Sequence, residues 1–138
     1  MSYISSTATQ ADASDGIEDG VIDISFYRNH VIYIKLDKKM IGLTTDINEL
    51  SIGETYCIVL QQNEKGKKKV LFDADYAENL WGKLSKKPQA QSKPFTFTNV
   101  PQISLEPNSI SMISCLCISG INGKQLLCSV ASGFPGKE

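Results

Sequence analysis

Few residues in this chain could carry out catalysis, because it holds a single histidine, His30, among 138 residues. His30 is the one base that a Ser-His-Asp triad could use, and it begins a run that alternates like a strand, where a lone histidine is more often structural than catalytic. Asp73 and Asp75 could act as paired carboxylates or bind a cation, but the start of a solvated loop explains them better. No phosphate-binding loop or zinc-protease motif is present. The sequence therefore predicts a protein that is not an enzyme and has no cofactor.

The four cysteines are expected to be reduced residues of the core. Cys57, Cys115, Cys117 and Cys128 lie inside apolar runs and form no C-x-x-C pair. Zinc sites need clustered cysteine and histidine ligands at loop spacings, so metal binding is the lesser alternative. Buried free cysteine behaves as a small hydrophobic residue, and this usage fits assembly in the cytoplasm.

Two groups of lysines raise an alternative function, the binding of single-stranded nucleic acid by an OB-like groove. Aromatic side chains that could stack on bases lie near them in the sequence. The formal net charge of −1 argues against it, because nucleic-acid binders usually carry a basic excess. A carbohydrate-binding β-sandwich that uses Trp81 and Tyr76 is a further alternative. The lysines are Lys65, Lys67, Lys68, Lys69, Lys83, Lys86 and Lys87, and the aromatic residues are Tyr33, Tyr56, Phe72 and Trp81.

The elements that would position these residues are predicted to be strands. From Gly20 to Phe134 the chain is rich in Val, Ile, Tyr and Phe in short runs with turn signals between them, which predicts one antiparallel, jelly-roll-like β-sandwich. Residues 54–62 and 69–72 are expected to form one hairpin, residues 73–94 a long loop, residues 103–105 a short strand, and residues 111–119 and 124–131 a closing hairpin. The expected core is Ile32, Ile34, Tyr56, Ile58, Leu60, Phe72, Ile113, Leu116 and Leu127.

The ends of the chain have a different composition. Residues 1–19 are rich in Ser, Ala, Thr and Asp and cannot bury enough apolar surface to fold alone. We interpret them as a flexible arm that attaches the protein to a larger particle through Tyr3, Ile4 and Ile17, and residues 135–138 as a tail. A chain that begins at Gly20 should then fold and oligomerise normally. The first residues do not have the pattern of a secretory signal, and no apolar run reaches the length of a membrane span.

The strand at residues 111–119 is apolar on both faces, although a two-sheet sandwich buries only one face of each strand. Either the 73–94 loop or a neighbouring subunit must cover the second face, and we favour the subunit. We expect Ile113 to point outward on this strand. The predicted interface is Met112, Ile113, Cys115, Leu116 and Cys117.

The order of these features resembles a domain of bacteriophage tail-fibre and head-fibre proteins. The similar segments are Asn29–Leu36, Gly42–Thr45, Gly53–Gln62 and Gly66–Phe72, followed by Leu80–Gly82, Pro101–Leu105 and the hairpin that closes at Phe134. Leu126 and Leu127 stand where the family typically has aromatic residues, and the tryptophan loop lacks the usual extra glycines and prolines.

The resemblance implies a trimeric β-sandwich and a place in a virion. It makes the chain a capsid decoration or head-fibre protein, or a short fibre or tail component, assembled in the host cytoplasm. Its expected partners are two further copies of itself and other virion proteins, with neither membrane nor nucleic acid.

Overall fold

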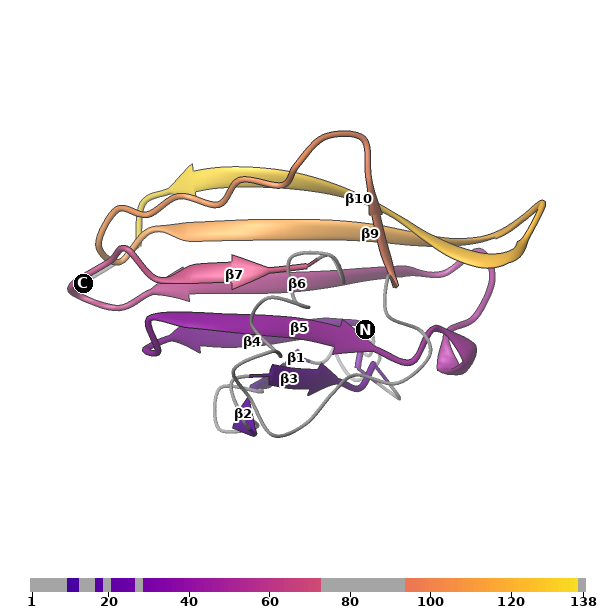
Figure 1. The fold of residues 1–138 in the computed structure, drawn as a ribbon, viewed down its shortest axis with the longest axis horizontal. Coiled ribbons are helices and arrows are strands. Elements are labelled where there is room, and N and C mark those ends of the chain that lie inside the picture. The colour runs from indigo at the N-terminus through magenta and orange to yellow at the C-terminus, as the bar shows by residue number, and fades with distance from the viewer. Residues whose placement is uncertain (1–9, 13–16, 19–20, 27–28, 73–93, 137–138) are drawn as a thin grey trace, which may run out of the picture.

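The computed structural model describes residues 10–12, 17–18, 21–26, 29–72 and 94–136. These residues form ten strands and one turn of 3₁₀ helix, arranged in two sheets (Figure 1). The elements are β1 (Gln10–Asp12), β2 (Ile17–Glu18), β3 (Val21–Ile24), β4 (Val31–Leu36), β5 (Met40–Thr45), η1 (Ile47–Glu49), β6 (Thr55–Gln62), β7 (Lys69–Leu71), β8 (Phe95–Phe97), β9 (Ile110–Gly120) and β10 (Gly123–Phe134). The prediction that the chain folds as β-structure is confirmed.

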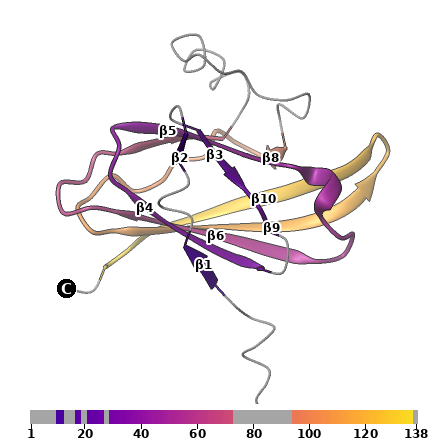
Figure 2. The same ribbon diagram turned by 90° about the horizontal axis from the view of Figure 1, so that it is seen from below.

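The two sheets pack face to face as two layers (Figure 2). The larger has the strand order β1-β4-β6-β9-β10-β8, and the smaller has the order β2-β3-β5-β7. Apolar side chains from both sheets meet in one core, including Ile22 and Ile41 of the smaller sheet and Ile34, Ile58 and Ile113 of the larger. This core forms because strand residues alternate between faces, so every second Ile or Leu points to the other layer.

The path of the chain differs from the predicted antiparallel, jelly-roll-like sandwich. From β3 to β7 the chain changes sheet with every strand, so that β4 and β6 pair in parallel in one layer and β3, β5 and β7 pair in parallel in the other. β1 and β8 are also parallel to their neighbours, and only β2 with β3, β6 with β9, and β9 with β10 are antiparallel. The expectation of antiparallel sheets was therefore wrong.

Two local predictions are also wrong. Residues 54–62 and 69–72 do not form a hairpin, because β6 belongs to the larger sheet and β7 pairs with β5 in the smaller. Residues 103–105 are not a strand. The closing hairpin is confirmed, since β9 and β10 pair from Gly120 and Gly123 outward.

The outer strands of the sheets come partly from the segment predicted to be a flexible arm. β1 lies beside β4 at one edge of the larger sheet, and β2 lies beside β3 at one edge of the smaller. Ile17 lies in β2, whereas Tyr3 and Ile4 lie outside the described residues. The proposed division into an arm, a domain and a tail remains a prediction.

Candidate functional site

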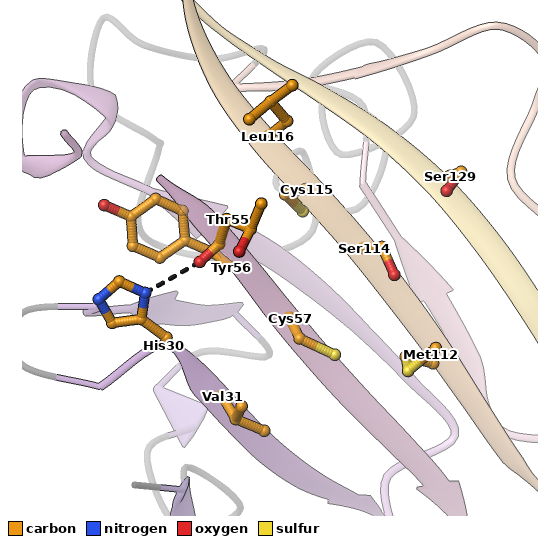
Figure 3. A pocket seen from close by; sticks show the side chains of 10 residues that line it. All are labelled: His30, Val31, Thr55, Tyr56, Cys57, Met112, Ser114, Cys115, Leu116 and Ser129. Atoms are coloured by element: carbon orange, nitrogen blue, oxygen red, sulfur yellow. Dashed lines mark hydrogen bonds between the residues drawn. The ribbon is translucent and has the colours of Figure 1, made fainter. Parts of the chain in front are cut away.

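A shallow trough of about 690 Å³ lies on the outer face of the larger sheet (Figure 3). The registers of β4, β6, β9 and β10 place their outward side chains in rows across the sheet. One row of mostly small side chains, Cys57, Ser114 and Ser129, forms the floor. The neighbouring rows carry the larger Met112 and Leu116, so the trough is the depression between two apolar ridges.

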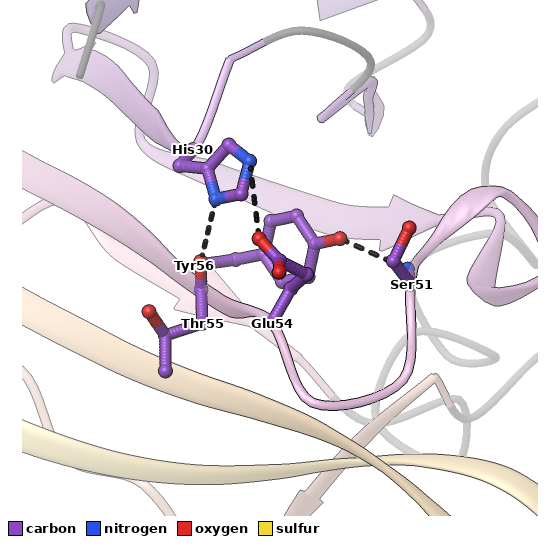
Figure 4. Close-up of polar contacts among 5 residues, drawn as sticks. All are labelled: His30, Ser51, Glu54, Thr55 and Tyr56. Atoms are coloured by element: carbon purple, nitrogen blue, oxygen red, sulfur yellow. Dashed lines mark hydrogen bonds and ion pairs between the residues drawn. The ribbon is translucent and has the colours of Figure 1, made fainter. Parts of the chain in front are cut away.

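His30 lies at one end of the trough, and its imidazole ring contacts neighbouring residues of the protein (Figure 4). Its Nδ1 lies 2.9 Å from the carbonyl oxygen of Thr55, and its Nε2 lies 3.7 Å from a carboxylate oxygen of Glu54. Its ring stacks on Tyr56, with centroids 4.9 Å apart. These contacts fix the imidazole as a bridge between β4 and β6, which supports the structural interpretation of this residue.

Tyr56 anchors the same corner of the molecule. Its ring is buried and contacts Phe26, with centroids 4.9 Å apart, and its hydroxyl accepts a hydrogen bond from the backbone N–H of Ser51 at 3.0 Å. The Tyr56 ring is therefore part of the packing inside the protein.

The thiol on the floor of the trough is not activated as a nucleophile. Burial raises the pKa of the Cys57 thiol, so this partly buried sulfur is held in its less reactive protonated form. Among the residues that the structure describes, no three His, Cys, Asp or Glu side chains gather as metal ligands. Asp73 and Asp75 lie outside those residues.

The cysteines are free, as the sequence indicated. Cys115, Cys117 and Cys128 are buried, and Cys57 is partly buried on the outer face. No disulfide links any two of them, so the prediction of reduced core cysteines agrees with the structure for three of the four.

The predicted interface residues divide between the two faces of β9. Met112 and Leu116 point outward, and Leu116 is 39% exposed. Ile113, Cys115 and Cys117 point into the core and are at most 2% exposed, so they cannot meet a second subunit. The choice of Ile113 as an outward position was wrong, because the alternation on β9 runs the other way.

Two residues of the predicted core belong instead to the outer face. Leu116 and Leu127 are register partners across β9 and β10, and Leu127 is 40% exposed. The other seven predicted core residues all belong to the buried core. Sequence reasoning missed the trough itself, although the Ser and Cys positions that alternate with larger residues carried its signal.

Two of the four aromatic residues proposed for an OB-like base-stacking surface are buried in the core. Tyr56 and Phe72 are 6% and 3% exposed, and Phe72 packs against Phe95 and Phe97. Tyr33 donates a hydrogen bond from its hydroxyl to the Gln61 side-chain oxygen at 2.7 Å. Trp81 and Tyr76 lie outside the described residues, so the carbohydrate alternative is untested.

No helix among the described segments is long and apolar enough to cross a membrane. Comparison of the chain with models of known protein families, with curated proteins and with solved structures gives no match.

Proposed function

We propose that this chain is a non-enzymatic structural subunit of a bacteriophage particle that associates with further copies of itself. The outer face of the larger sheet, defined as the outward side chains of β4, β6, β9 and β10, is the observation that carries the self-association. The virion role is supported by the resemblance of the segment order to fibre-type domains. On this proposal the protein is a capsid decoration or head-fibre protein, or a short fibre or tail component.

Two rows of mostly apolar side chains cross the central strands of the outer face. Across the sheet, Val59 of β6 lies beside Met112 of β9, which lies beside Ala131 of β10. Two rows further, on the other side of the trough floor, Leu116 lies beside Leu127. Exposed apolar side chains scattered singly are ordinary, but two apolar ridges on the same face of one sheet favour an interaction site.

The absence of charge on these strands favours a second copy as the partner. None of the outward residues on β6, on β9 from Met112 to Ile118, or on β10 from Gln125 to Ala131 is acidic or basic. An uncharged face can be buried against another subunit without leaving an unpaired charge removed from water. The one charged outward residue on these four strands is Lys35, on the flanking strand β4.

The stoichiometry proposed is three, as the resemblance implies, with attachment to other virion proteins through the N-terminal segment that includes Tyr3, Ile4 and Ile17. Assembly takes place in the host cytoplasm, and the proposal involves no cofactor, membrane or nucleic acid.

Substituting Leu116→Asp tests the self-association. Size-exclusion chromatography with light scattering should give an oligomer for the unaltered chain and a monomer with an unchanged β circular dichroism spectrum for the variant, because the carboxylate would be desolvated between subunits. Ile121→Asp is the matched control, since Ile121 is fully exposed at the turn between β9 and β10. A monomeric unaltered chain, or a Leu116→Asp variant of unchanged mass, would refute the interface.

The virion role is tested separately. Mass spectrometry of gradient-purified particles from the source of this sequence should find its peptides at a fixed ratio to those of the major capsid protein. Their absence from intact particles would refute a role in the virion and leave the oligomer result intact.

A further inference from the structure

Two cysteines face each other across the hairpin of β9 and β10. Cys115 and Cys128 are register partners, and their Sγ atoms lie 3.3 Å apart. Both side chains point into the core, where they are 2% and 9% exposed, and both are free thiols. This pairing brings together two residues that are 13 positions apart in the sequence.

The geometry is close to that of a disulfide. Residues directly opposite each other on antiparallel strands have Cα atoms about 4.5–5.5 Å apart, within the range that a disulfide bridges. The two sulfurs need to approach by about 1.3 Å to reach bonding distance, which side-chain rotation can provide. The other two cysteines lack this arrangement, because Cys117 is opposite Leu126 and Cys57 points to the outer face.

The two thiols are chemically unequal. The hydrogen bond between the two sulfurs lowers the pKa of Cys128 against the opposing effect of burial. The same hydrogen bond, followed by burial, raises the pKa of Cys115. Cys128 is therefore the sulfur that more readily becomes the nucleophilic thiolate.

We propose that Cys115 and Cys128 form a redox-active dithiol that closes to a disulfide when the protein meets a small-molecule disulfide such as oxidised glutathione. The Cys128 thiolate attacks one sulfur of the oxidant and releases one small thiolate. Cys115 loses its proton and attacks the Cys128 sulfur of the mixed disulfide, releasing the second. In sum, two protein thiols are oxidised to one disulfide, and one oxidant molecule is reduced to two small thiols that take up the protons.

The consequence of this step rests on the proposed function. A particle assembled in a reducing cytoplasm and then released passes into oxidising surroundings, where disulfides persist. Closing the pair there would link the two longest strands of the sheet that carries the outer face. The protein would fold and assemble with both thiols reduced, and the disulfide would link the two strands afterwards.

The test treats the purified full-length chain with oxidised glutathione or with dithiothreitol, then maps peptides without reduction. Trypsin cleavage after Lys124 separates Cys128 from Cys115, so the disulfide appears as two linked peptides within a single chain. The oxidised protein should also have a thermal midpoint about 10 °C higher than the reduced protein, because the cross-link restricts the unfolded chain.

Two matched variants identify the partners, since Cys117 lies on the same tryptic peptide as Cys115. Cys117→Ser should keep the linked peptides and the rise in midpoint, and Cys115→Ser should lose both. Circular dichroism verifies that each variant is folded. Unlinked peptides in the oxidised unaltered chain, or a link that persists in Cys115→Ser, would overturn the proposal. Because the readout uses isolated protein, this result is independent of the oligomer and virion tests.

Discussion

Gln62 shows how a polar side chain is accommodated in this core. It is 2% exposed, yet its amide nitrogen donates to the carbonyls of Lys68 and Ser104 at 2.8 and 3.0 Å. Its side-chain oxygen accepts from the backbone N–H of Lys68 at 2.9 Å. A buried amide is tolerated when backbone groups satisfy it, and here it also joins the turn after β6 to the irregular segment before β9.

Asp23 on β3 is a residue whose charge opposes folding. Partial burial, and then the negative charge of Asp46, raise its pKa above the ordinary value of 3.8. A raised pKa means that ionising this carboxyl is less favourable in the folded state than in the unfolded one. Its penalty on stability is therefore fully present above the folded pKa, shrinks as the pH falls, and vanishes below the unfolded value.

Asp23→Asn should accordingly raise the urea midpoint of unfolding at pH 7 and leave it unchanged at pH 3, where the carboxyl is protonated in both states. Equilibrium unfolding followed by circular dichroism measures both midpoints. An equal gain at the two pH values would show that the charge of Asp23 is not the cause.

At the scale of elements, the side chain of Asn63 stabilises the turn that connects β6 to β7. The side-chain oxygen of Asn63 accepts hydrogen bonds from the backbone N–H groups of Lys65 and Gly66 at 2.9 and 3.1 Å. Its side-chain nitrogen donates to a carboxylate oxygen of Asp37 at 3.1 Å, which ties the turn to the connection between β4 and β5. These contacts link the two connections, β4 to β5 and β6 to β7, by which the chain passes from the larger sheet to the smaller.

Gly66 is the residue on which this turn depends. Its φ is +69°, and a Cβ at this position would lie 2.5 Å from the carbonyl oxygen of Leu105. Gly66→Ala should therefore destabilise the protein by about 2 kcal/mol or more, from the left-handed backbone and the clash together. Chemical denaturation gives the value.

Gly53→Ala provides the control for this prediction. Gly53 also has a positive φ, +90°, but an added Cβ would meet no atom within 4 Å. Gly53→Ala should therefore lower the free energy of unfolding only through the left-handed backbone, without a steric clash. If Gly66→Ala costs no more than Gly53→Ala, the close approach of Leu105 does not matter.

At the scale of the whole molecule, the N-terminal segment closes one edge of each sheet. β1 and β2 are short, and they pair with β4 and β3, which would otherwise present unpaired backbone groups to solvent. Short edge strands of this kind limit pairing with other chains. The segment thus has a role within the fold in addition to any role in attachment.

Deleting residues 1–19 should expose the edges of β4 and β3 and cause concentration-dependent association. Light scattering over a dilution series measures it, with the full chain as the reference. This expectation revises the simpler one that a chain beginning at Gly20 behaves normally. A truncated protein with the mass and solubility of the full chain would show that the edge strands are dispensable.

The sequence by itself determined most of the strands after Gly20 and most of the core. Alternation places Ile32 and Ile34 on one face of β4 and Ile58 and Leu60 on one face of β6, and the short turn after Gly120 specifies the last hairpin, because both signals are local. Three of the four cysteines in apolar runs could also be recognised as free core residues.

Only the tertiary structure decided which strands pair and which face of β9 lies inward. Parallel pairing of β4 with β6 joins segments separated by a strand of the other sheet, and no local pattern records it. On β9, both faces are apolar, so periodicity could not distinguish Ile113 from Leu116; packing against the smaller sheet placed Ile113 in the core. The trough and the Cys115–Cys128 pair follow from register between strands, which is fixed when the two layers close around a common core.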